Sequence, residues 1–213
     1  MDYQELLSKL STFIAHQGEK YVSPAKAGPH APEMESLKSQ GQQARSAFTA
    51  LALALEERVP GFNRQATSQW MNQAQILRPH FWAYFIEETR SSQEPAIALR
   101  VLQDTKSLGI SLEVSVIERS LAEDTLSRLN RVLDLPCQDG LYYFAQENGT
   151  SRRVEMTEEN RKALVGSVEK GCVRKVQVKY DVTDLSQFSS FEDLEEELLK
   201  GWEIIQPYYR ITQ

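Results

Sequence analysis

The chain has 213 residues, of which 41% are apolar and 25% charged, a composition typical of a globular domain rather than a disordered segment. No apolar run approaches the roughly 20 residues that a membrane-spanning helix needs, and the first residues lack the basic flank of an export signal. The net charge of −6 argues against non-specific binding to nucleic acid or to anionic membranes. We therefore expect a cytoplasmic protein with no membrane partner.

The sequence of residues 1–60 predicts two helices joined by a loop. Leu6, Leu10 and Phe13 recur at helical spacing and predict a helix over residues 3–15. A stretch rich in glycine and proline follows, and then an alanine- and leucine-rich helix over 32–57. We expect residues 1–60 to form a helical segment that packs on or beside the main domain.

Residues 61–213 carry mixed strand and helix patterns. Between residues 110 and 117, Ile110, Leu112 and Val114 alternate with polar residues, which predicts a strand with one buried face. In chain order we predict a helix at 67–77, strands at 81–87, 96–102 and 110–117, a helix at 122–133, a strand at 141–146 with a hairpin partner at 152–156, a helix at 157–169, a strand at 173–182 and a helix at 191–208. This order predicts an α+β domain at 61–213, with a mostly antiparallel sheet of about five strands flanked by helices.

The common enzyme motifs are absent from the sequence. There is no G-x-G-x-x-G turn, no phosphate loop of the form G-x-x-x-x-G-K-[ST] and no G-x-S-x-G elbow. His16, His30 and His80 lie far apart, and Cys137 and Cys172 form no C-x-x-C pair. We therefore expect no cofactor and no metal ion, and the balance leans against an enzyme.

The segment between residues 69 and 87, QWMNQAQILRPHFWAYFIE, combines aromatic rings with amide side chains. Such a mixture suits either a core element with a polar rim or a concave binding site. On the predicted strand, Trp82 and Tyr84 share one face while Phe81 and Phe85 share the other. One pair of rings must be core, and the other lies under a helix or lines a pocket.

Charged residues mark the polar face of the later strands. A hairpin that turns around Thr105 to Ser107 would bring Arg100 near Glu113, and Lys179 decorates the strand at 173–182. Two interpretations of this polar face stay open. It binds an anion or nucleic acid, or it is an ordinary solvated face with cross-strand ion pairs.

The leading hypothesis is a domain that binds a nucleic acid or a nucleotide-like, anionic small molecule. Trp82 would stack, Arg78 would hold an anionic group and Asn72 would donate or accept a hydrogen bond. The full set of candidate ligand-binding residues is Trp70, Asn72, Arg78, His80, Trp82, Arg100, Glu113 and Lys179.

Two alternatives stay open, and no catalytic residue is assigned. In a small enzyme, His80 or Glu113 would be the general base and Arg100 an oxyanion or phosphate partner. In a protein-interaction module, the helix at 32–57 would form a homodimer.

A resemblance to a small uncharacterised bacterial family covers roughly residues 60 to 210. It rests on the stretches QWMNQAQILRPHFWAYF, ISLEVSVIER, LYYFAQENG, EENR and VRKVQVKYD. Members of that family are sometimes labelled glucose-6-phosphate 1-dehydrogenase, which implies an NADP enzyme. This chain lacks a nucleotide fingerprint and is far shorter than the usual two-domain dehydrogenase, so we expect no such activity.

The order of elements is also similar to the N-terminal DNA-reading domain of the restriction protein McrB. That similarity implies an α+β module that holds a flipped base in an aromatic pocket. It carries over no individual residue.

Overall fold

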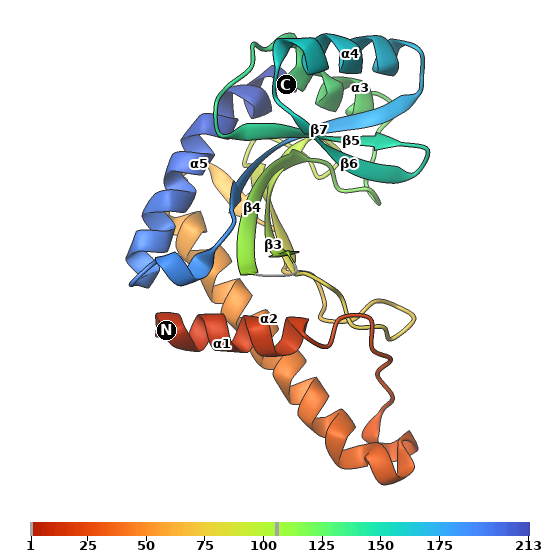
Figure 1. Cartoon of the computed structure of the whole chain (residues 1–213), viewed down its shortest axis with the longest axis vertical. Coiled ribbons are helices and arrows are strands. Elements are labelled where there is room, and N and C mark those ends of the chain that lie inside the picture. Colours follow the sequence, from red (N-terminus) through yellow and green to blue (C-terminus); the bar gives the residue numbers. More distant parts are fainter. Residues whose placement is uncertain (1, 105–106) are drawn as a thin grey trace.

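The computed structural model describes residues 2–104 and 107–213. Within these residues the chain forms five α-helices and one seven-stranded antiparallel sheet, which confirms the predicted α+β class (Figure 1). The helices are α1 (Tyr3–Ile14), α2 (Ala31–Arg58), α3 (Thr125–Asn130), α4 (Glu158–Glu169) and α5 (Phe191–Ile211). The strands are β1 (Phe62–Arg64), β2 (Trp82–Glu87), β3 (Ala96–Asp104), β4 (Ser107–Ser115), β5 (Leu141–Glu147), β6 (Thr150–Glu155) and β7 (Val173–Val182).

The sheet has more strands than the five or so that the sequence predicts. Its described strands lie in the order β1-β2-β3-β4-β7-β5-β6, and every neighbouring pair is antiparallel. β6 is the predicted hairpin partner of β5. β1 was not predicted because three residues are too few for an alternating pattern to show. The hairpin turn expected around Thr105 to Ser107 falls partly on Thr105 and Lys106, which lie outside the described residues.

The predicted helix at 67–77 is wrong, because this segment is irregular and forms no helix. Its backbone groups bond across to other segments: Ser68 N donates to Trp82 O at 2.9 Å, and Arg78 N donates to Trp70 O at 3.0 Å. Gln75 has a φ of 59°, in the left-handed region that ends a helix. Bonds between distant segments therefore override the local helical pattern.

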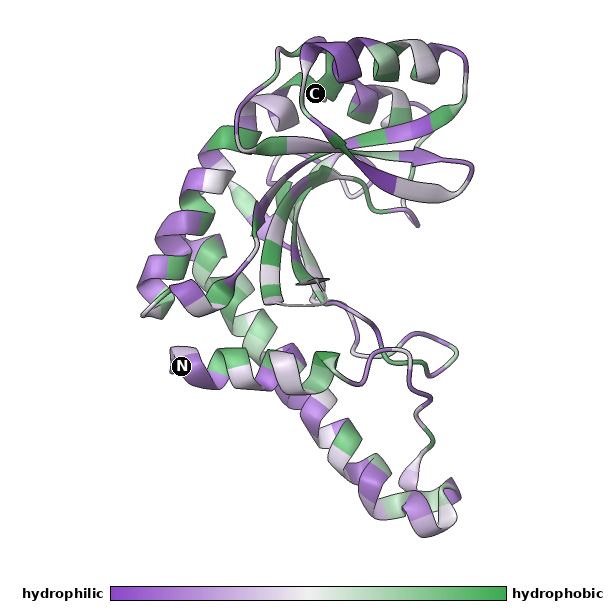
Figure 2. Ribbon diagram, in the orientation of Figure 1, coloured by the Kyte–Doolittle hydropathy of each residue, from purple (hydrophilic) through white to green (hydrophobic). Residues whose placement is uncertain are grey.

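The two faces of the sheet differ in chemistry. One face is apolar and packs against the helices; its fully buried residues include Phe85, Leu99, Leu112, Tyr143 and Val178. Figure 2 shows the underlying alternation as green and paler bands along β4. Figure 1 shows the sheet curving so that α5 lies on its outer side and the opposite face is concave. This concave face carries polar residues of the central strands, including Ser111, Glu113, Gln177 and Lys179.

The N-terminal helices share the main core. The ring of Phe13 in α1 lies 5.5 Å from the ring of Phe81, and the ring of Phe48 in α2 stacks on Phe81 at 6.0 Å. Burial of these rings supplies much of the hydrophobic driving force that holds the helices against β2. The division into a helical segment at 1–60 and a domain at 61–213 stays a prediction.

Side-chain caps mark the N-termini of α4 and α5, two of the helices that flank the later strands. The Ser190 side chain accepts from Asp193 N, and Asp193 in return accepts from Ser190 N, which makes a capping box at the start of α5. Thr157 caps α4 by accepting from Asn160 N. Among the described helices, none is long and apolar enough to cross a membrane.

Candidate functional site

The register of the central strands gathers polar side chains on the concave face. Arg100 of β3 pairs with Ser111 of β4, Glu113 of β4 pairs with Lys179 of β7, and Lys179 pairs with Tyr142 of β5. Directly paired residues point to the same side of a sheet, and diagonal neighbours remain within reach of long side chains. The sheet therefore places Arg100, Glu113 and Lys179 beside one another.

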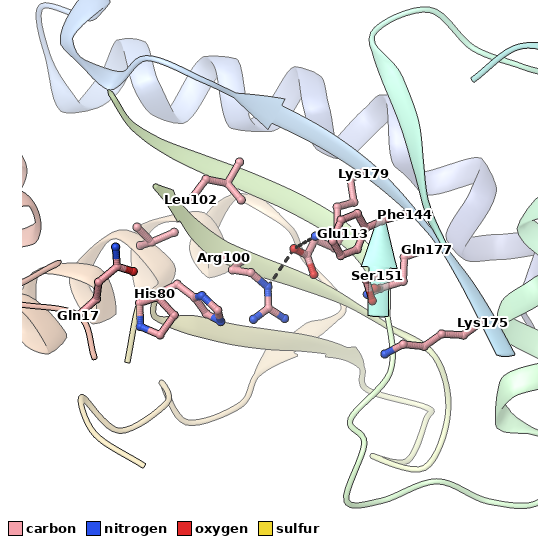
Figure 3. Close-up of a pocket in the computed structure, with 12 residues that line it drawn as sticks. Gln17, His80, Arg100, Leu102, Glu113, Phe144, Ser151, Lys175, Gln177 and Lys179 are labelled. Atoms are coloured by element: carbon pink, nitrogen blue, oxygen red, sulfur yellow. Dashed lines mark hydrogen bonds and ion pairs between the residues drawn. The ribbon is translucent and has the colours of Figure 1, made fainter. Parts of the chain in front are cut away.

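A cavity of about 370 Å³ opens on this face (Figure 3). Its floor comes from β3, β4 and β7. One wall comes from the residues just before β2 together with Gln17 in the turn after α1, and the other from the β5–β6 hairpin. The described lining residues are Gln17, Pro79, His80, Arg100, Val101, Leu102, Glu113, Phe144, Ser151, Lys175, Gln177 and Lys179.

A buried ionic cluster forms the floor of the cavity. Glu113 Oε1 accepts from Arg100 Nε at 2.9 Å and from Lys179 Nζ at 2.6 Å. The Glu113 side chain is 1% exposed and that of Lys179 is 7% exposed. Burial raises the pKa of Glu113, but Arg100 and Lys179 outweigh it and lower that pKa to about 2. The carboxylate is therefore ionised at neutral pH and fixed between two cations.

Trp82 supports the cations rather than lining the cavity. The Arg78 guanidinium lies 4.7 Å from its ring centroid, and that of Arg100 lies 5.3 Å away. The His80 ring lies 5.6 Å from it. Cation–π attraction of this kind orients a guanidinium. The Trp82 ring thus joins Arg78 and His80 to the cluster of Arg100, and its expected role in stacking on a ligand stays a prediction.

His80 is a neutral group in this setting. Burial, and then the charge of Arg100, lower its pKa to about 4. At neutral pH it offers one ring nitrogen as donor and one as acceptor. A carboxylate with a pKa near 2 is also a weak base, since general bases work best with a pKa near the working pH. The arrangement therefore suits binding better than proton transfer.

The β7 edge of the cavity adds further polar groups. Lys175 pairs with Glu118, which also accepts from Arg174 at 3.1 Å. Gln177 Nε2 donates to Ser115 Oγ at 2.5 Å. Lys175 and Gln177 are not in the predicted set, although their alternation with apolar residues in 173–182 places them on the face of Lys179. For Gln17, in the turn after α1, no local sequence pattern indicated a role.

Besides Arg78 and Trp82, two more candidate residues are not among the residues that line the cavity. Trp70 is 7% exposed, and its ring contacts Phe13 edge-on at 6.2 Å and Tyr21 at 5.0 Å. Gly41 of α2 lies against the same ring, because a Cβ there would come within 2.8 Å of Trp70 Cδ2. Asn72 is used in a turn, where its Oδ1 accepts from Ile76 N at 3.0 Å. Trp70 is thus part of the core and Asn72 part of a turn, and their expected roles in ligand binding stay predictions.

In the described part of the chain, no group of three or more His, Cys, Asp or Glu side chains is placed to hold a metal ion. The described cations and amides of the cavity instead suit an anionic or hydrogen-bonding ligand.

Comparison with known proteins places the chain in a family. The model of one protein family matches residues 20–137, more than half of the chain, including α2, β1 to β4 and α3. No curated protein matches the chain, and no solved structure matches it. These comparisons give no support to the dehydrogenase label or to the similarity to McrB. Because the match spans more than half of its residues, the chain belongs to this uncharacterised protein family.

Proposed function

We propose that the protein binds an anionic small molecule in the cavity on the concave face of the sheet. The observation that carries this proposal is the charge of the described lining: Arg100, Lys175 and Lys179 converge on a cavity whose lining has one carboxylate, Glu113. Glu113 is already shared by two of these cations. The lining therefore keeps a surplus of positive charge.

This surplus contrasts with the rest of the molecule, because the whole chain has a formal net charge of −6. A concave, partly desolvated site of one sign focuses the electric field and raises the local concentration of ions of the opposite sign. Arg100 adds geometric selectivity. Its Nε is bound to Glu113, and Figure 3 shows the far end of its guanidinium facing the cavity. The two terminal nitrogens of a guanidinium can hold a carboxylate or phosphate in a bidentate manner.

The dimensions favour a small molecule over a polymer. A volume of about 370 Å³ lies at the lower end of the range of about 300–1,000 Å³ seen for small-molecule sites. A polyanion would also approach a chain of net negative charge, which weakens its overall electrostatic attraction to the protein. Nucleic-acid binding is therefore a competing outcome of the experiment below.

The test compares two lysine variants. Lys175→Gln removes a lining cation whose side chain is 11% exposed, and Glu118 keeps Arg174 as a partner. Lys162→Gln, on the exposed side of α4, removes the same charge away from the cavity and is the matched control. The probes are inorganic phosphate, AMP and a short single-stranded oligonucleotide. Binding is measured by titration calorimetry and by the rise in melting temperature that ligand binding causes.

We expect phosphate or AMP to bind the unmodified protein and the Lys162→Gln variant equally. We expect about tenfold weaker binding to Lys175→Gln, the loss expected for one hydrogen bond to a charged group. Equal losses in both variants would show non-specific charge attraction. Failure of every small anion to bind, or a clear preference for the oligonucleotide, would contradict the proposal.

A further inference from the structure

The Glu113 carboxylate uses only one of its two oxygens within the described part of the structure. Oε1 accepts from both Arg100 and Lys179, whereas Oε2 is buried and has no hydrogen-bond partner among the described residues. Buried polar atoms without a partner are rare in native proteins, and each calls for an explanation. This one belongs to a residue that lines the cavity, and Figure 3 shows it at the centre of the lining residues.

The partner that Oε2 lacks must donate a hydrogen bond, because an ionised carboxylate can only accept. It must also be uncharged. Arg100 and Lys179 already surround Glu113, and Lys175 adds a third positive charge to the lining. An ammonium group placed beside Oε2 would lie close to these like charges, which disfavour it. A hydroxyl group donates a hydrogen bond without adding charge.

The remaining polar groups of the lining suit the same ligand. Gln177 and Ser151 offer an amide and a hydroxyl, which can donate to and accept from further hydroxyl groups. The neutral His80 ring can do both as well. An inorganic anion without a hydroxyl group, such as sulfate, would use the cations alone and leave Oε2 without a donor.

We infer that the ligand is a hydroxylated anion: its phosphate or carboxylate contacts Arg100 and Lys175, and one of its neutral hydroxyl groups donates to Glu113 Oε2. This inference rests on the proposed function and makes it more specific, since it names the second chemical group that the ligand must carry.

The experiment varies the ligand and leaves the folded protein unchanged. Glycerol 3-phosphate is compared with propyl phosphate, and glycerate with propionate, by titration calorimetry on the full chain. Within each pair the carbon count and the acidic group are kept while the hydroxyl groups are removed. Phosphoethanolamine is compared with ethyl phosphate to test an ammonium group at the same place.

We expect the hydroxylated member of at least one pair to bind at least tenfold more tightly, because its absence leaves a buried charged acceptor unpaired. The pair that shows this preference identifies the acidic group as phosphate or carboxylate. Equal affinity within both pairs would overturn the inference while leaving anion binding intact. Tighter binding of phosphoethanolamine than of ethyl phosphate would also overturn it. If no anion binds, the result contradicts the proposed function itself and, with it, this inference.

Discussion

The buried ionic cluster predicts a large and specific loss of stability when one of its charges is removed. In the variant Glu113→Gln, the amide keeps the shape of the side chain but loses the charge that Arg100 and Lys179 share. Arg100 is 19% exposed and can turn toward solvent, whereas Lys179, at 7%, keeps its ammonium in a buried place. Removing one partner of a buried pair costs about 3–5 kcal/mol. That is a large fraction of the total of about 5–15 kcal/mol that stabilises a typical domain.

A double-mutant cycle separates the pair interaction from other effects of the substitutions. Lys179→Met keeps most of the apolar stem and removes the ammonium, and the double variant Glu113→Gln/Lys179→Met removes both charges. If the two groups interact as their distance of 2.6 Å indicates, the double variant loses less stability than the sum of the single losses. The expected coupling is about 1–3 kcal/mol.

The assay is urea unfolding, with free energies from linear extrapolation and equal slopes as the check that the unfolded state is unchanged. Glu35→Gln is the matched control, since Glu35 pairs with Lys38 on an exposed part of α2 at 3.3 Å. Loss of such a surface pair should cost less than about 1 kcal/mol. A Glu113→Gln loss no larger than that of the control, or strict additivity of the single losses, would refute the reasoning.

Three further predictions concern individual residues, and a fourth concerns the dehydrogenase label. His80 has a pKa lowered to about 4 by burial and by nearby cations, so the unfolded chain takes up its proton at higher pH than the folded chain, and stability should fall as the pH drops from about 6.5 to about 4. His80→Gln should reduce this fall in urea midpoints, and identical pH profiles would contradict the assignment. Gly201→Ala should lower the melting temperature, because its Cβ would lie 2.7 Å from Tyr180 Cε1 and such overpacking costs about 1–3 kcal/mol. Gly166→Ala, which meets nothing within 4 Å, should raise it through helix propensity; equal shifts would refute the packing argument. Trp82→Ala should weaken AMP binding while changing the melting temperature little, because this half-buried ring supports cations rather than the core; a large thermal loss would assign it to the core. Incubation with glucose-6-phosphate and NADP should produce no NADPH, and robust hydride transfer would overturn our rejection of the dehydrogenase label.

The class of the fold and the division of each clear strand into two faces were predictable because their signals are local. In β2 and the residue before it, the alternation of rings placed Phe81 and Phe85 on one face and Trp82 and Tyr84 on the other. The structure buries the first pair completely and leaves the second pair half-buried. The proximity of Arg100 and Glu113 was also expected, since they are 13 residues apart and a hairpin joins their strands.

Other features were out of reach because they depend on contacts between distant segments. The alanine- and leucine-rich pattern of α2 indicated a helix, but not that Gly41 would give Trp70 a place in the core. The segment at 67–77 has a helical pattern of apolar residues, yet its backbone groups bond to segments outside it. A sequence window cannot weigh these long-range bonds against local propensity.

The sequence by itself determined most of the elements and the two faces of their clearest strands, because side-chain periodicity follows directly from helix and strand geometry. Only the tertiary structure decided which of these faces meet. β7 inserts between β4 and β5, so that Lys179 reaches a carboxylate 66 residues earlier in the chain. The cavity exists because the curved sheet, the β5–β6 hairpin and the turn after α1 surround that contact. Such a site depends on strand order and curvature, which no local pattern encodes.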